Sequence, residues 1–154
     1  MRWSKLKQRV ERNFADCIGR RIAIHSTAYG ACTCGHAWLT LDGVVIANFC
    51  TRAHTNRFRY GLKENDLGVS DAQAKKYADQ YVEYGEMSRQ DVYEACWAYI
   101  HELSFDEALK SEDPLIQTLA GLGRRRFPQV EKSDLHPLAR KLFEVRLANE
   151  RITV

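Results

Sequence analysis

The sequence predicts an α+β fold: an N-terminal helix, a three-stranded antiparallel meander with an Asp-Gly hairpin, and then a helical C-terminal half packed on the sheet. Two observations carry this prediction. The pair Asp42-Gly43 separates two β-prone segments, which is a favoured two-residue hairpin turn. From residue 70 onward, helix-start signals recur instead of strand signals. Because strands and helices occupy separate parts of the chain, we expect α+β rather than an alternating α/β order.

The length and composition are those of one globular domain. A chain of 154 residues is long enough to bury ~68–70% of its unfolded surface. Hydrophobic residues make up 45% of the chain and charged residues 28%, which excludes a disordered protein. The sequence contains neither an internal repeat nor a linker, and we expect a single α+β domain over residues 1–154.

The first two elements are an amphipathic helix over residues 4–15 and a strand over residues 20–29. Apolar residues recur at the helical spacings of three and four at Trp3, Leu6, Val10 and Phe14. The solvent side of this helix is expected to carry Lys5, Arg9 and Arg12. Gly19 interrupts that pattern, and the following segment alternates with the period of a strand. Alternation places Ile22 and Ile24 on one face of this strand.

The Asp-Gly turn fixes a predicted register for the next two strands. Counting outward from the turn, the sequence pairs Leu41 with Val44, Leu39 with Ile46, and Ala37 with Asn48. Paired residues share a sheet face, so one face is aliphatic, with Leu39, Leu41, Val44 and Ile46. The other face carries His36, Trp38, Thr40, Val45, Ala47 and Phe49. Residues 56–61 could form a fourth strand of this sheet.

Most helices of the C-terminal half begin with a capping side chain, which satisfies helix N–H groups that lack an intrahelical partner. These starts are Ser70 with Gln73, Ser88 with Asp91, Ser104 with Glu107, and Asp113 before Pro114. His136 before Pro137 marks the start of the last helix. Apolar residues follow each start at helical spacing. Gly121 and Gly123 end one of these helices, so they do not form the phosphate-binding glycine motif that opens a helix.

Two cysteines and a histidine precede the hairpin and raise the question of a metal site. The candidate ligands are Cys32, Cys34, His36, Cys50 and His54. Structural zinc sites space their thiolates by two to four residues, whereas one residue separates the first pair here. The predicted register also places His36 and Cys50 on opposite faces of the hairpin. The pattern therefore favours a loop between strands, and we expect no cofactor.

Two arrangements offer catalytic chemistry. His25 and Thr27 share a strand face and could donate protons to a phosphate group, as in a phosphate-directed hydrolase. Cys50 and His54 could act as nucleophile and base, although the sequence supplies no oxyanion hole. Known metalloprotease, nucleotide-binding and serine-hydrolase motifs are missing. The sequence thus favours a protein that is not an enzyme.

Basic and aromatic residues carry the main functional hypothesis. The net charge of +3 is too small to imply a polyanionic partner, but basic residues cluster locally. Expected phosphate contacts are Lys5, Arg9, Arg12, Arg124, Arg125 and Arg126. Tyr29 and Trp38 would stack on bases if their sheet face is open. The alternative is that helices cover this face and that Trp38 packs against Tyr77 or Tyr81.

Several segments together resemble a family of small uncharacterised bacterial proteins that open on Trp-Ser-Lys-Leu-Lys. The likeness covers most of the chain and is most distinctive over Trp3–Lys7 and Ser111–Leu115. The other segments that carry it are "GRRIAIHST", "AWLTLDG" and "IANFC". The resemblance implies a bacterial cytoplasmic protein, and it brings no activity and no catalytic residue with it.

The resulting interpretation is a small cytoplasmic, non-enzymatic protein that binds an anionic partner such as RNA or DNA. A protein-interaction or regulatory module is the first alternative, and the His25/Thr27 hydrolase is the second. The charged N-terminal segment lacks the apolar run of a secretory signal, and five cysteines with uneven spacing do not suggest a disulfide framework. No segment reaches the ~18 apolar residues of a membrane span, so we expect no membrane partner.

Overall fold

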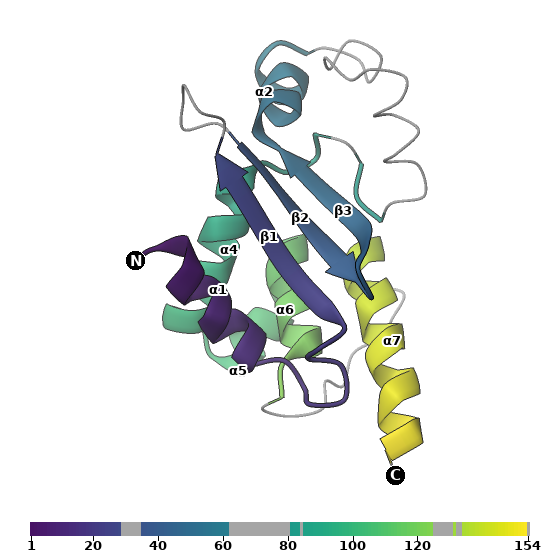
Figure 1. The fold of residues 1–154 in the computed structure, drawn as a ribbon. Helices are drawn as coiled ribbons and strands as arrows, with labels where there is room; N and C mark the ends of the chain where they lie inside the picture. Colours follow the sequence, from purple (N-terminus) through teal and green to yellow (C-terminus); the bar gives the residue numbers. More distant parts are fainter. Residues whose placement is uncertain (29–34, 62–80, 84, 125–130, 132–133, 154) are drawn as a thin grey trace. The chain divides into compact units, whose positions relative to one another are not determined.

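The structure of the protein is a computed structural model that describes residues 1–28, 35–61, 81–83, 85–124, 131 and 134–153. Its elements are α1 (Trp3–Arg12), β1 (Ile22–Ala28), β2 (Gly35–Leu41), β3 (Val44–Cys50), α2 (Thr51–Arg59), α4 (Arg89–His101), α5 (Phe105–Leu109), α6 (Pro114–Leu122) and α7 (Pro137–Thr153) (Figure 1). This order of helix, three strands and helices confirms the predicted α+β class. Among the described helices, none combines the length and apolar character needed to cross a membrane.

The chain divides into two compact units. Unit 1 contains Met1–Ile22 and Tyr93–Val154, and unit 2 contains Ala23–Val92. The boundaries fall within β1 and α4, so unit 1 holds α1, α5, α6 and α7, while unit 2 holds β2, β3 and α2. That these units form a single domain over residues 1–154 stays a prediction.

The three strands form one sheet in the order β1-β2-β3, and the β2–β3 hairpin confirms the predicted turn. Asp42 and Gly43 have φ angles of 51° and 80°. A type I′ turn requires positive φ at both central residues, which glycine and aspartate tolerate better than bulkier residues do. As predicted, Leu41 pairs with Val44 next to the turn.

Beyond the turn, the predicted register is wrong by one residue. Thr40 pairs with Val45, but Leu39 pairs with Ala47, so the pairing shifts between Leu39 and Thr40. Ile46 is therefore the extra residue of a β-bulge. Its carbonyl accepts a hydrogen bond from the backbone N–H of Tyr81 at 3.2 Å, so this group at the bulge is satisfied from outside the hairpin.

The bulge exchanges the faces of the residues that follow it, because a shift of one residue in a strand reverses the side-chain direction. Ala47 and Phe49 were expected beside Trp38, and that assignment is wrong. Phe49 instead pairs with Ala37, and both are fully buried. Trp38 pairs with Asn48, which places a buried amide on its face of the hairpin.

Residues 56–61 do not add a fourth strand, because residues 51–59 form α2. The short alternation of basic and aromatic residues at 57–60 fits the period of a strand, but it is too short to exclude a helix. Helical spacing accounts for it equally well, since the rings of His54 and Phe58 are four residues apart and lie 4.7 Å from each other. α2 packs against β2 and β3.

Two of the predicted capping boxes are present. The backbone N–H of Ser88 donates to Asp91, and the N–H of Asp91 donates back to the Ser88 hydroxyl at 3.1 Å. Ser104 and Glu107 make the same reciprocal pair at the start of α5. These bonds also lower the pKa of Glu107. The box predicted at residues 70–73 lies outside the described residues.

The starts of α6 and α7 are confirmed as well. Asp113 accepts hydrogen bonds from the N–H groups of Leu115 and Ile116, at 2.9 and 3.1 Å. At α7, the ring Nδ1 of His136 accepts from the N–H of Leu138 at 3.1 Å. A neutral imidazole can therefore act as a helix cap in the way that an aspartate or asparagine side chain does.

The core of unit 1 contains a buried charge. Leu119 and Leu122 of α6 and Leu138 and Leu142 of α7 are buried. In the same unit, Arg146 is only 3% exposed. Its Nη1 donates to the carbonyls of Gly121 and Gly123 at 2.9 and 2.7 Å, and its Nε lies 3.4 Å from Glu150. A cation at the C-terminal end of a helix complements the negative end of the helix dipole. Arg146 thus holds the end of α6 against α7.

We predict that Arg146→Met lowers the free energy of unfolding by about 2–4 kcal/mol, because it leaves two buried carbonyls without a donor. The measurement is urea unfolding followed by circular dichroism. Arg20→Met is the matched control, since Arg20 is exposed and its replacement should change the stability by less than ~0.5 kcal/mol. Equal, small losses in both variants would contradict a structural role for Arg146.

Candidate nucleic-acid interface

α1 presents a row of cations on one side. Lys5, Arg9 and Arg12 are exposed, whereas Leu6 and Val10 are fully buried. The three cations fall at positions i, i+4 and i+7, which lie on the same side of an α-helix. Two of them, Arg9 and Arg12, occupy the last turn, where positive charge is favourable. The predicted solvent-facing position of these residues is confirmed.

The backbone of Arg124 lies next to the C-terminal end of α1. Its backbone N–H donates to the carbonyl of Asn13 at 2.7 Å, directly after the last residue of α1. The preceding residue, Gly123, forms an antiparallel bridge with Phe14. The structure thus brings together four of the predicted phosphate-binding residues, and we call them the basic stripe: Lys5, Arg9, Arg12 and Arg124. Arg125 and Arg126 lie outside the described residues.

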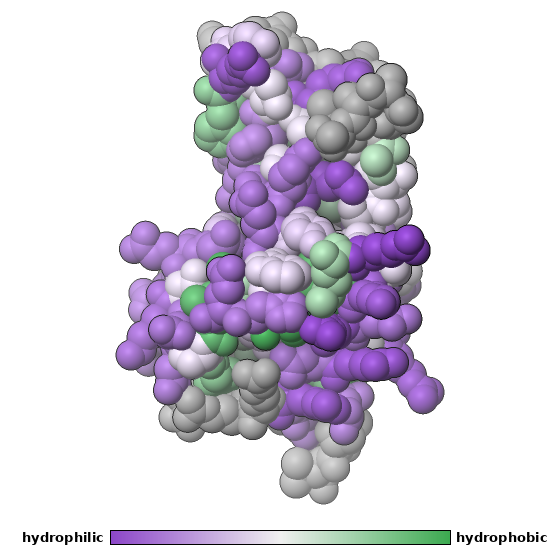
Figure 2. All heavy atoms as spheres, turned by 90° about the vertical axis from the view of Figure 1, so that its left-hand side faces the viewer, coloured by the Kyte–Doolittle hydropathy of each residue, from purple (hydrophilic) through white to green (hydrophobic). Residues whose placement is uncertain are grey.

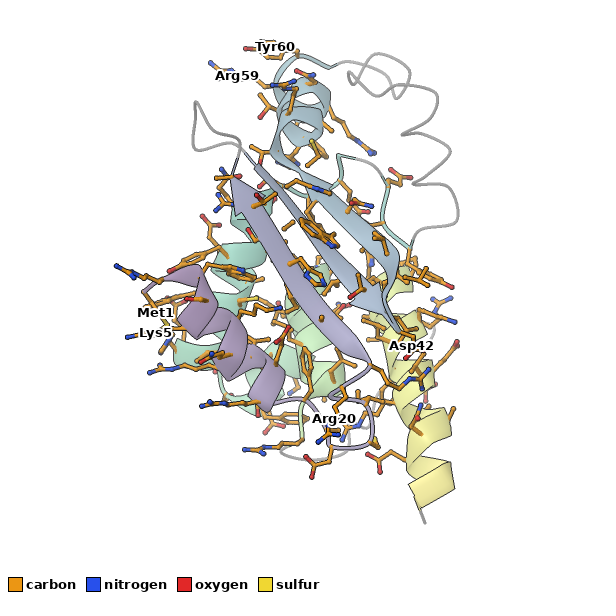
Figure 3. All side chains as sticks on the ribbon, in the orientation of Figure 1. Met1, Lys5, Arg20, Asp42, Arg59 and Tyr60 are labelled. Atoms are coloured by element: carbon orange, nitrogen blue, oxygen red, sulfur yellow. The ribbon has the colours of Figure 1, made fainter. Side chains whose placement is uncertain are left out.

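The surface around the basic stripe is polar. Figure 2 is turned toward the side that carries α1, and hydrophilic side chains dominate this part of unit 1, with small hydrophobic areas between them. Figure 3 shows Lys5 on the outer side of α1. A surface of this kind suits a charged partner better than an apolar one.

Position 123 requires glycine because the neighbouring atoms leave no room for a side chain. A Cβ atom at this position would lie 2.4 Å from the hydroxyl oxygen of Tyr99. That hydroxyl accepts a hydrogen bond from Nδ2 of Asn13 at 3.2 Å, so it cannot move away without losing this bond. The close approach therefore ties the segment before Arg124 to the end of α1.

Trp38 has a different environment from the one expected. It is half-buried, and its ring stacks with His25 at 5.0 Å and with His36 at 4.9 Å between ring centroids. The imidazoles are themselves held, because His25 is hydrogen-bonded to Thr40 and His36 to Asn48. Stacking within the sheet already occupies this indole. That Trp38 stacks on bases stays a prediction, and Tyr29 lies outside the described residues.

The hydrolase alternative depended on His25 and Thr27. The ring Nε2 of His25 lies 3.1 Å from the hydroxyl of Thr40 on the neighbouring strand β2, while Thr27 is exposed. One partner of His25 in the structure is therefore Thr40, which no local sequence pattern indicates. That His25 and Thr27 donate protons to a phosphate group stays a prediction.

The bulge changes one argument about the metal candidates. His36 pairs with Cys50, so the two share a face of the hairpin, and the expectation that they lie on opposite faces is wrong. His54 Nδ1 donates to the carbonyl of Gly85 at 3.1 Å. Cys32 and Cys34 lie outside the described residues. Within the part of the chain that the structure describes, no three His, Cys, Asp or Glu side chains are placed to hold a metal ion.

The described thiols are Cys17, Cys50 and Cys96, and none of these three forms a disulfide. Burial raises the pKa of Cys96 to about 12. Burial and the nearby carboxylate of Glu150, 3.5 Å from the sulfur, also raise the pKa of Cys17. Neither thiol is therefore activated as a nucleophile at neutral pH, which requires a lowered pKa.

Sequence reasoning missed a polar network in unit 2. Arg89 Nε donates to the hydroxyl of Ser26 at 2.8 Å, and its backbone N–H donates to the hydroxyl of Thr51 at 3.3 Å. The Thr51 hydroxyl in turn donates to Gln90 at 2.7 Å. The network connects β1, α2 and the start of α4 within this unit, and no local sequence signal marks these partners.

We predict that Gly123→Ala destabilises unit 1 by about 1–3 kcal/mol, because the added methyl group collides with the Tyr99 hydroxyl. In a Tyr99→Phe background that hydroxyl is gone, so the cost of Gly123→Ala should fall by ~1 kcal/mol or more. A double-mutant cycle from denaturant unfolding measures this difference. Strictly additive effects would show that the collision is not the cause.

We also predict that Cys96 is inert toward iodoacetamide in the folded protein at pH 8. With a pKa of about 12, only about one thiol in ten thousand is ionised at that pH, and the thiolate is the reactive form. Peptide mapping by mass spectrometry measures the labelling of the Cys96 peptide. The urea-unfolded protein is the control, in which Cys96 should react fully. Rapid labelling of folded Cys96 would contradict its burial.

Comparison with known proteins supports the resemblance noted in the sequence. Residues 2–147 match the SF0329 protein family, which is nearly the whole chain. No curated protein and no solved structure matches the chain. The family is uncharacterised, so the match carries no activity and no site residue. The chain belongs to the SF0329 protein family.

Proposed function

We propose that this protein binds a polyanion, and specifically a nucleic acid, through the basic stripe, without catalysing a reaction. One observation carries the proposal: the hydrogen bond from Arg124 to Asn13 adds a fourth cation to the three exposed on α1. Cations that neutralise phosphates release condensed counterions, and this release drives much of the affinity for nucleic acids. Such contacts position a nucleic acid without reading its sequence.

The spacing of the stripe supports a phosphate backbone as the partner. Lys5 and Arg12 are seven residues apart, which is a rise of about 10 Å along the helix. Successive phosphates of one strand advance by ~3.4 Å along a duplex, so the helical part of the stripe matches about three phosphate intervals. Arg124 is exposed, and its backbone lies next to the C-terminal end of α1, which adds a fourth cation near this row.

The local charge supports the same partner more strongly than the net charge does. α1 contains one acidic residue, Glu11, and its carboxylate pairs with Lys7 at 2.8 Å. This pair lies at positions i and i+4 on another side of the helix from Arg9. The cations of the stripe therefore face outward without an acidic residue of α1 among them.

We predict that the variant Arg9→Gln/Arg12→Gln/Arg124→Gln reduces the salt dependence of binding. Each phosphate contact contributes about −0.7 to −0.9 to the slope of log K against log salt concentration, so the slope should lose about 2 in magnitude. The measurement is fluorescence anisotropy with labelled RNA and DNA, single- and double-stranded, at several salt concentrations.

A matched pair of charge reversals serves as the control. Lys5→Glu and Lys110→Glu change the net charge equally and both lie in unit 1, but only Lys5 belongs to the stripe. Lys5→Glu should weaken binding markedly, and Lys110→Glu should not. Equal effects would attribute binding to net charge alone. If the unmodified protein fails to bind any of these nucleic acids at low salt, the proposal is wrong, and a protein partner becomes the next candidate.

A further inference from the structure

The exposed end of α2 combines features that its packing does not explain. We call it the α2 tip: Arg57, Phe58, Arg59 and Tyr60. Phe58 is 60% exposed and Tyr60 62% exposed, and they are two of the four exposed large hydrophobic residues among those described. Figure 3 shows Arg59 and Tyr60 projecting outward at the end of α2, away from the strands of the same unit. Two exposed aromatic side chains only two positions apart in the sequence indicate a binding surface.

Each of these rings lies beside an arginine. The guanidinium carbon of Arg57 lies 5.4 Å from the centroid of the Phe58 ring, and that of Arg59 lies 5.6 Å from the Tyr60 ring. Both distances are within the range of a cation–π contact, ~6 Å. Arg57 also forms an ion pair with Glu83, which partly neutralises its charge. Among the contacts described, Arg59 has no such ion pair, so its charge is more available to a ligand.

The segment that forms α2 and the tip carries no acidic residue of its own. Residues 51–60 contain three arginines and no acidic residue, which is the charge complement of a phosphate chain. Aromatic rings add a second kind of recognition, because a base can stack on an exposed ring whatever its identity. Arginine and an aromatic ring side by side can therefore contact the phosphate and the base of the same nucleotide.

We infer that the α2 tip is a stacking platform for single-stranded nucleic acid, with Phe58 and Tyr60 contacting bases and Arg59 contacting phosphate. A duplex keeps its bases stacked inside and offers only its backbone, so it leaves the two rings without a partner. An acidic peptide would satisfy the arginine but give the rings nothing to stack on. This inference rests on the proposed function and names its substrate class.

The tip is better suited to this role than Trp38. The Trp38 ring is half-buried and already stacks with two imidazoles, whereas the rings of Phe58 and Tyr60 are more than half exposed. Phe58 does lie 4.7 Å from His54, at a tilted angle of 44°, so this contact leaves ring surface available. The tip belongs to unit 2, and the basic stripe belongs to unit 1.

The test separates stacking on bases from attraction to phosphates. The probes are a short labelled single-stranded DNA and an abasic strand of the same length, titrated by fluorescence anisotropy at one salt concentration. The unmodified protein should bind the base-bearing strand about 5- to 100-fold more tightly than the abasic strand. Phe58→Leu/Tyr60→Leu should abolish this preference while keeping the affinity for the abasic strand.

Three control variants make the result specific. Tyr60→Phe keeps the ring and should keep the preference, whereas Arg59→Gln should weaken binding to both strands by a similar factor. Trp38→Leu should leave the preference intact. Circular dichroism and thermal unfolding check that each variant is folded, and Tyr60→Leu alone replaces the double variant if that one does not fold.

The outcomes for this inference and for the proposed function are distinct. If the unmodified protein binds neither strand and none of the RNA and DNA probes of the salt titration, the proposed function fails and takes the inference with it. If it binds those probes but neither of the two strands used here, only the stacking platform is overturned. If it binds both strands equally, polyanion binding stands and the stacking platform is overturned. A preference that survives Phe58→Leu/Tyr60→Leu, or that is lost only in Trp38→Leu, also overturns the platform at the α2 tip.

Discussion

The buried guanidinium of Arg146 is the constraint on which the basic stripe depends. It donates hydrogen bonds to the carbonyls of Gly121 and Gly123 at the C-terminal end of α6. The last carbonyls of a helix have no N–H partner within the helix itself, so a side chain can satisfy them. Gly123 held in this way bridges to Phe14, and the next residue bonds to the end of α1. A buried charge is costly unless its hydrogen bonds are satisfied. Here those bonds fix the segment that carries Arg124, so a core interaction determines the arrangement of a surface.

A single extra residue has a comparable effect in unit 2. The bulge at Ile46 reverses the faces of every later residue of β3, which puts Phe49 opposite Ala37 and Asn48 opposite Trp38. The buried amide of Asn48 then meets the ring of His36, which stacks on Trp38. A polar group buried in a sheet is tolerated because it finds this partner. The bulge thus makes the Trp38 face a hydrogen-bonded, internally stacked surface.

Local features of the fold could be predicted from the sequence, and long-range ones could not. The Asp42-Gly43 turn and the capping boxes depend on residues a few positions apart, so their signals are complete within a short segment. The bulge involves a bond from Tyr81 to Ile46, which no local pattern around the hairpin indicates. The fourth strand predicted over residues 56–61 was wrong because basic and aromatic residues alternate there over too few positions to distinguish a strand from a helix.

The same distinction holds for the candidate site. Helical periodicity was enough to place Lys5 and Arg12 on the solvent side of α1, whereas the position of Arg124 required a bridge between distant parts of the chain. The basic stripe and the α2 tip also differ physically. Salt screens exposed charges, so the contribution of the stripe falls as ionic strength rises. Base stacking does not depend on net charge, so salt should weaken the proposed contacts of bases with the rings of the tip less than it weakens phosphate contacts. In the proposed function, the stripe therefore provides the affinity for any phosphate chain, and the tip provides the choice between paired and unpaired strands.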